Sequence, residues 1–172
     1  MIEMLPKLFF GYFAVVLVVL SLLIVTRRNP VHSILLMLVM FFHIAGMYLF
    51  LNAEFLAAVQ VVLYAGAVLV MFLFVIMMLN LKKELTAERF IGEWPIGVAL
   101  VFSILMLMVF SITNFMKGPS GHYTIDSVKN ETHTKLLGKV LYTEYLLPFE
   151  LASLILLIAI VGAIVLAKKR KA

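Results

Sequence analysis

Apolar residues along the chain fall into five long runs, and nearly all charged residues lie between these runs. The hydrocarbon core of a bilayer is about 30 Å thick, so a helix needs about 20 apolar residues to cross it. The predicted spans cover approximately residues 6–25, 30–51, 53–80, 95–115 and 148–167. The pattern therefore predicts an all-α membrane protein with five transmembrane helices, organised as a single polytopic membrane domain over residues 1–172.

Polar residues at the ends of the runs predict where individual helices begin. Asn29 is a suitable N-cap for the second span, and Pro30 is a suitable first helical residue. Asn52 is expected to cap the third span in the same way, which places Glu54 in the first turn, where the helix dipole favours an anion. Glu54 is then either a dipole-compensating carboxylate near the membrane interface or a proton-handling acid, and both readings stay open.

The third run is too long and too polar for a simple span. An α-helix over residues 53–80 is about 42 Å long, so it must tilt, protrude or contain an irregular turn. Gln60 and Tyr64 are four residues apart and are expected on one helix face, where each needs a polar partner, whether for a structural bond between helices or for function. Gly66 weakens the helix and admits a neighbouring backbone. A glycine beside a hydrogen-bonding tyrosine makes Tyr64–Gly66 a candidate place for a π-bulge, the irregular turn often found at functional sites.

Composition and charge agree with a membrane location. Hydrophobic residues make up 65% of the chain and charged residues 13%, against about half and about a quarter in soluble domains. The first run is as long as a full span and lacks a small-residue cleavage site, so it is predicted to be a helix and not a cleaved signal peptide. The net charge of +5 needs no nucleic acid as partner, because the basic residues flank the spans.

The distribution of lysine and arginine predicts the orientation. With five spans, the segments around Arg27, Arg28 and the C-terminal "KKRK" fall on the more basic side. The positive-inside rule places the C-terminus in the cytoplasm, and the N-terminus and the extracytoplasmic loop 116–147 outside. We expect a multi-pass protein of the plasma (inner) membrane of a bacterium.

Polar residues elsewhere offer weaker signals. His43 lies in mid-membrane and is expected to be a neutral imidazole bonded to a carbonyl or a neighbouring helix. Leu137, Val140, Leu141 and Tyr145 repeat at helical spacing, which predicts a short interfacial helix leading into the fifth span. Glu150 is expected in the first turn of that span, as a dipole-compensating or interfacial carboxylate.

No pattern in the chain predicts bond chemistry. The chain has no cysteine, which excludes disulfides and cysteine-ligated iron–sulfur clusters within it. It also lacks a nucleophile placed with a base, a phosphate-binding glycine loop and a compact metal-ligand set. We therefore predict no catalytic, cofactor-binding or metal-ligating residue here, and a chain that packs among other membrane helices.

Three stretches carry a resemblance to a known family: "EFLAAVQVVLYAGAVLVMFLFVIMMLN", "NPVHSILLML" and "LGKVLYTEYLLPFELASLILLIAIVGAIVLAKK". They resemble the J subunit (chain 6) of proton-pumping NADH:quinone oxidoreductase, respiratory complex I. The resemblance implies a membrane-arm subunit without a redox centre. FMN, iron–sulfur clusters and quinone would belong to other subunits, and the partners would be A-, H- and K-type subunits, neighbouring antiporter-like subunits and the lipid bilayer.

The same resemblance implies roles for residues of the third span. The family's third helix carries a π-bulge around the positions of Tyr64 and Gly66, and it switches between bulged and regular forms as quinone is reduced. The switch would open or close a water path toward glutamates of the K-type subunit, which makes Tyr64, Gly66, Glu54 and Gln60 the candidate coupling residues. Certain relatives carry glutamate where this chain has Gln60, and an amide cannot titrate.

Two other functions remain open from the sequence. Related membrane complexes use similar arms: cation/proton antiporter assemblies, membrane-bound hydrogenases and quinone oxidoreductases with another electron donor. A stand-alone small transporter is less compatible with the chain, because five spans give no equal inverted halves and no paired broken helices.

Overall fold

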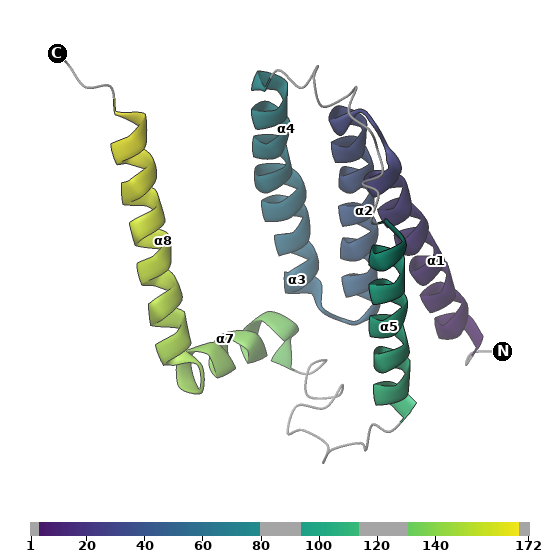
Figure 1. Cartoon of the computed structure of the whole chain (residues 1–172). Coiled ribbons are helices and arrows are strands. Elements are labelled where there is room, and N and C mark those ends of the chain that lie inside the picture. Colours follow the sequence, from purple (N-terminus) through teal and green to yellow (C-terminus); the bar gives the residue numbers. More distant parts are fainter. Residues whose placement is uncertain (1–3, 80–93, 114–130, 169–172) are drawn as a thin grey trace.

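The computed structural model describes residues 4–79, 94–113 and 131–168, and every regular element in these ranges is helical (Figure 1). In chain order the elements are α1 (Met4–Thr26), α2 (Pro30–Phe50), α3 (Glu54–Val59), the π-helical segment η1 (Gln60–Val68), α4 (Leu69–Met78), α5 (Trp94–Thr113), α7 (His133–Thr143) and α8 (Leu146–Ala167). Elements α3, η1 and α4 form one continuous third span. Five helices are long and apolar enough to cross a membrane, as the sequence predicted.

The first three spans pack side by side as two successive antiparallel pairs, with α2 in the middle (Figure 1). Helices α1 and α2 approach closely at Gly46, where an added Cβ would lie 3.3 Å from the ring of Phe13. Phe13 is buried, and its ring also meets that of Phe50 at a centroid distance of 5.5 Å. A glycine opposite an aromatic ring thus sets the spacing of α1 and α2, in keeping with the role of small residues between membrane helices.

The connection between α1 and α2 is held by the cap that the sequence predicted. The side-chain oxygen of Asn29 accepts a hydrogen bond from the backbone N–H of Val31 at 3.0 Å, and Pro30 opens the helix. The hydroxyl of Ser33 donates to the carbonyl of Ile24 across the turn at 3.0 Å. These bonds satisfy groups that a helix end otherwise leaves unpaired.

The connection between α2 and α3 corrects one prediction. Asn52 is not the N-cap of the third span, because Ala53 occupies that position and makes no side-chain cap. Asn52 instead has a positive φ of 56° and terminates α2. Its N–H bonds the carbonyl of Leu49, and the N–H of Ala53 bonds the carbonyl of Tyr48, which is the Schellman pattern. Asparagine suits this place because it tolerates the left-handed region better than other non-glycine residues.

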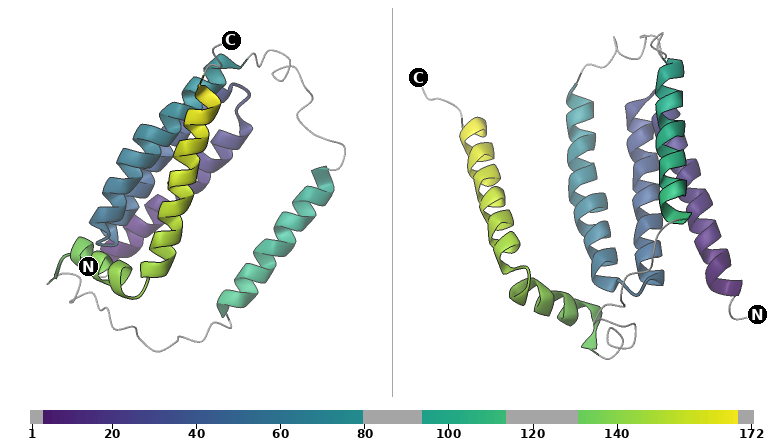
Figure 2. Two further views of the ribbon diagram at one scale, coloured as in Figure 1. Left: turned by 90° about the vertical axis from the view of Figure 1, so that its left-hand side faces the viewer. Right: turned by 60° about the horizontal axis from the view of Figure 1, so that its bottom comes forward.

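The fourth and fifth spans do not join the three-helix unit. Within the described ranges α5 contacts no other helix, and α8 contacts only α7. The left view of Figure 2 shows α5 standing well away from the other spans. None of the residues in the most apolar part of α5 or α8 is buried. Their surfaces are therefore left for lipid or for other chains.

The amphipathic segment before the fifth span forms α7, as predicted, and it contacts α3 (Figure 1). Leu136 is its buried residue. Two details differ from expectation. Tyr145 is the N-cap of α8 and does not belong to the apolar face of α7, and α8 begins at Leu146 instead of Pro148. Glu150 therefore lies beyond the first turn of α8. Pro148 permits this early start because the first-turn N–H groups have no partner within the helix.

Candidate functional site in the third span

The third span contains the predicted irregularity, in the form of nine residues of π-helix from Gln60 to Val68. The N–H of Leu69 bonds the carbonyl of Tyr64, five residues earlier, where an α-helix uses four. Backbone angles stay helical at both ends of the segment, with φ and ψ of −59° and −43° at Val59 and −68° and −37° at Leu69. The extra residue is thus absorbed without breaking the helix, and the predicted position near Tyr64–Gly66 is confirmed.

The π segment changes which residues face the interior of the unit. The buried residues of the third span and its cap are Ala53, Ala57, Gln60, Ala65 and Leu69. The spacing is four, three, five and four, and the step of five falls inside η1. A regular α-helix continuing from Gln60 would present Tyr64 next, because its turn contains 3.6 residues. The bulge therefore leaves Tyr64 half-exposed and makes Ala65 the next buried residue.

Gln60 and Tyr64, which were predicted to share a helix face, differ in burial. Gln60 is 7% exposed and Tyr64 is 48% exposed. The i, i+4 spacing describes α-helical geometry, and the π segment changes it. Both side chains belong to a segment that contacts α2.

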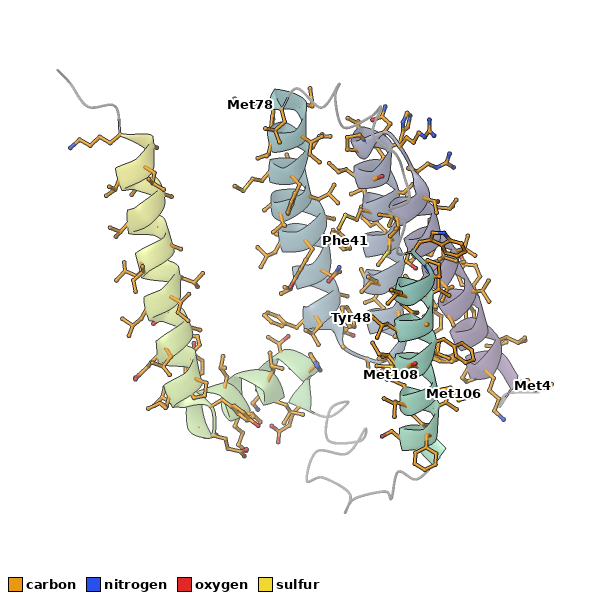
Figure 3. The ribbon with its side chains drawn as sticks, in the orientation of Figure 1. Met4, Phe41, Tyr48, Met78, Met106 and Met108 are labelled. Atoms are coloured by element: carbon orange, nitrogen blue, oxygen red, sulfur yellow. The ribbon has the colours of Figure 1, made fainter. Side chains whose placement is uncertain are left out.

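Tyr64 is held by ring packing and not by a hydrogen bond within the described part of the chain. Its ring meets that of Phe41 edge-on, with the centroids 5.9 Å apart and the planes at 75°. In Figure 3, Phe41 and Tyr48 lie between α2 and the third span. The phenol is free to bond water or another chain, since no described residue pairs with it.

Gly66 is not required by the backbone conformation, since no glycine among the described residues has a positive φ. A Cβ added at Gly66 would lie 3.4 Å from the carbonyl oxygen of Val61, which is an ordinary contact distance. A methyl group therefore fits, whereas a branched side chain adds atoms beside the π turn. Gly66 is exposed, and no described residue of another helix lies within 4 Å of an added Cβ, so the three-helix unit does not require its small size.

Glu54 occupies the first turn of the third span and is exposed. The N–H groups of a first turn have no partner within the helix, so the carboxylate lies in the favourable field of the helix dipole. The contact between α3 and α7 is close to this end of the span. The geometry agrees with the dipole-compensating reading and leaves the proton-handling reading open.

A second polar contact joins α1 and α2, and the sequence identified only one of its partners. His43 Nδ1 lies 2.8 Å from the carbonyl oxygen of Val39, and Nε2 lies 3.3 Å from the hydroxyl of Tyr12. A carbonyl can only accept, so Nδ1 carries the proton, and in the neutral ring Tyr12 donates to Nε2. The expected partners of His43, a carbonyl and a neighbouring helix, are both present. Tyr12 was missed, although a tyrosine inside an apolar span was the available signal.

Comparison with known proteins adds one family match and three relatives. Residues 20–166 match the family described as NADH-ubiquinone/plastoquinone oxidoreductase chain 6. The chain is 36% identical over 178 residues to NADH-ubiquinone oxidoreductase chain 6 of Chondrus crispus, covering 94% of this chain and 82% of that protein. It is 39% identical over 173 residues to NADH-quinone oxidoreductase subunit J of Rickettsia felis, covering 95% and 81%. It is also 35% identical over 164 residues to subunit J of Rhodobacter capsulatus, covering 94% and 81%.

Proposed function

Because the chain belongs to the NADH-ubiquinone/plastoquinone oxidoreductase chain 6 family, we propose that its third span couples quinone reduction to proton translocation in a membrane-bound NADH:quinone oxidoreductase. The chain is a membrane subunit of that type of complex, with relatives named subunit J in bacteria. The observation that carries the coupling proposal is the π segment in the middle of an otherwise α-helical span.

The π segment supports a switch because it has one discrete alternative. Removing the extra residue from the turn rotates one half of the span against the other by about 100° and shifts it by about 1.5 Å. Tyr64 and Val68 would then replace Ala65 and Leu69 as the buried residues of the span. Such exchanges between two packed arrangements are the kind of bistable element through which distant sites are coupled.

The exchange would change the polarity of the seam between α2 and the third span. With Ala65 inward the seam is apolar around the buried amide of Gln60, and with Tyr64 inward a phenol joins that amide. Two hydrogen-bonding groups at adjacent levels favour ordered water, which needs two to four polar partners. We propose that this is how the switch opens a water path toward the carboxylates of a K-type subunit. Gln60 serves there as a non-titrating contact, and Glu54 is the carboxylate of this span that could exchange protons.

Packing of the remaining helices supports assembly with other subunits. The apolar faces of α5 and α8 meet no other span within the described residues, which suits insertion among helices of other chains. We propose A-, H- and K-type subunits and an antiporter-like subunit as these neighbours, with the C-terminus in the cytoplasm. FMN, iron–sulfur clusters and quinone are assigned to other subunits, since this chain has no cysteine to ligate a cluster.

The test is a Gly66→Val substitution in the assembled complex. A branched side chain at this position stiffens the turn and meets the Val61 carbonyl region, so it should hold the span in one arrangement. We expect normal assembly, with fewer protons moved per NADH oxidised in proteoliposomes. Gly11→Val in α1 is the control, because an added Cβ there meets nothing within 4 Å. Full coupling in an assembled Gly66→Val complex would refute the switch, and absence of the oxidoreductase subunits from an affinity purification of the tagged chain would refute the assignment to this complex.

A further inference from the structure

A groove runs along the seam between α2 and the C-terminal half of the third span. It encloses a cavity of about 320 Å³. Apart from two arginines and Ser33 its lining is apolar, and includes Ile34, Met37, Phe41, Leu69 and Phe72. The hydroxyl of Ser33 already donates to the carbonyl of Ile24. The wall of the groove therefore presents no unpaired hydroxyl group, which suits an apolar occupant.

The mouth of the groove is positively charged. Arg27 and Arg28 line it, and both are exposed in the connection between α1 and α2. The N-terminus of α2 begins two residues later, and its dipole adds positive potential at the same place. Among the described residues the one ion pair is between Lys135 and Glu131, so neither arginine is paired with a described carboxylate. Arginine stays charged and binds phosphate through two parallel hydrogen bonds.

The depth of the groove matches one leaflet of a membrane. Its lining on α2 extends from Pro30 to Phe41, which is about 16 Å along the helix axis. Half of the hydrocarbon core is about 15 Å thick. Below this depth the ring contact between Phe41 and Tyr64 closes the seam. An occupant with a charged head at the surface and an apolar chain one leaflet long fits these dimensions.

We propose that this groove binds an anionic phospholipid, with its phosphate on Arg27 and Arg28 and one acyl chain between α2 and α4. A thin chain fits better than a helix of another subunit, because α2 and α4 are in contact along the seam and a helix is about 10 Å wide with its side chains. A zwitterionic lipid also carries a phosphate, but its cationic headgroup would lie beside the two guanidinium groups and be repelled by them. The proposal requires only that the chain spans a membrane, and it does not depend on the coupling role of the π segment.

The experiment uses the assembled complex in membranes that contain phosphatidylglycerol with a photoreactive diazirine in mid-chain. After irradiation, labelled peptides are identified by mass spectrometry. We expect labels on three residues of the seam, Met37, Phe41 and Phe72. Labelling should be weaker when phosphatidylcholine carries the same photoreactive acyl chain. The double variant Arg27→Gln/Arg28→Gln should lower phosphatidylglycerol labelling by about 30-fold, since each basic residue near the surface attracts anionic lipid. Lys168→Gln, at the end of α8, is the matched control and should not change it.

A second pair of variants tests the chain-binding part alone. Met37→Trp places an indole ring in the groove. Val39→Trp places the same ring in a different cavity, which His32 also lines. Only Met37→Trp should reduce labelling of Phe72. Equal labelling by the two headgroups, or labelling that survives the double arginine variant, would overturn the anionic headgroup site. Absence of any label in the seam of the wild-type complex would show that another subunit covers it and would overturn the lipid site altogether.

Discussion

Ala65 gives the sharpest test of the π segment, because its environment differs between the two arrangements of the third span. In the bulged form Ala65 is 5% exposed and faces the three-helix interior. In a regular α-helix that continues from Gln60, residue 65 is rotated by about 100° from that face. Ala65→Leu therefore adds three carbon atoms to a packed site in one arrangement and to an open one in the other.

The expected magnitude follows from the packing of the site. Extra methylene groups in a well-packed interior cost about 1–3 kcal/mol. That cost applies only to the bulged form, so it shifts the equilibrium between bulged and regular forms by about 5- to 150-fold. If the bulged form is favoured in the resting enzyme by no more than this amount, the regular form becomes the more populated one in Ala65→Leu.

The assay combines structure and turnover of the assembled variant complex. An electron cryo-microscopy map of resting Ala65→Leu enzyme should show a regular helix through residues 60–68 in a large share of particles. Proteoliposomes should show fewer protons translocated per NADH oxidised. Ala58→Leu is the control, because it adds the same atoms to an exposed position before the π segment. An Ala65→Leu complex with an unchanged π segment and full coupling would refute the assignment of Ala65 to the switching face.

Three further predictions concern single side chains. Gln60→Leu should reduce proton pumping less than Tyr64→Phe, because the amide is a non-titrating contact and the phenol is the proposed hydrogen-bonding group; equal or reversed losses of pumped protons would contradict these roles. Tyr12→Phe removes the hydrogen bond to His43, and such a bond between membrane helices contributes about 0.6 kcal/mol. The thermal half-life of the solubilised complex should therefore fall by no more than about threefold. A larger fall would show that this bond does more than join α1 to α2. Asn52→Gly should leave the yield of assembled complex on native gels unchanged, whereas Asn52→Val should lower it several-fold, since a β-branched residue is strained at a φ of 56°; equal yields would contradict the role of Asn52 in ending α2.

Much of the architecture follows from the sequence because the forces that define spans are local. Hydrophobicity and length place a helix in a membrane without reference to other helices, and the described residues contain five candidate spans, as predicted. The cap at Asn29 was predictable for the same reason, since a side chain that bonds a backbone group two residues away needs no tertiary contact. The excess length of the third run, together with Tyr64 and Gly66, marked a candidate place for a π turn, and the resemblance to the family predicted the turn itself.

The tertiary structure decided which way side chains point after that turn. One inserted residue rotates everything beyond it by about 100°, and the pattern of apolar residues cannot reveal this in a span that is apolar on all sides. The burial of Gln60 beside a half-exposed Tyr64, the position of Asn52 at the end of α2 and the bond between Tyr12 and His43 all depend on which helices meet. The separation of α5 and α8 is of the same kind. In a membrane every long apolar helix is equally soluble in lipid, so hydrophobicity defines the spans and only close packing selects their neighbours.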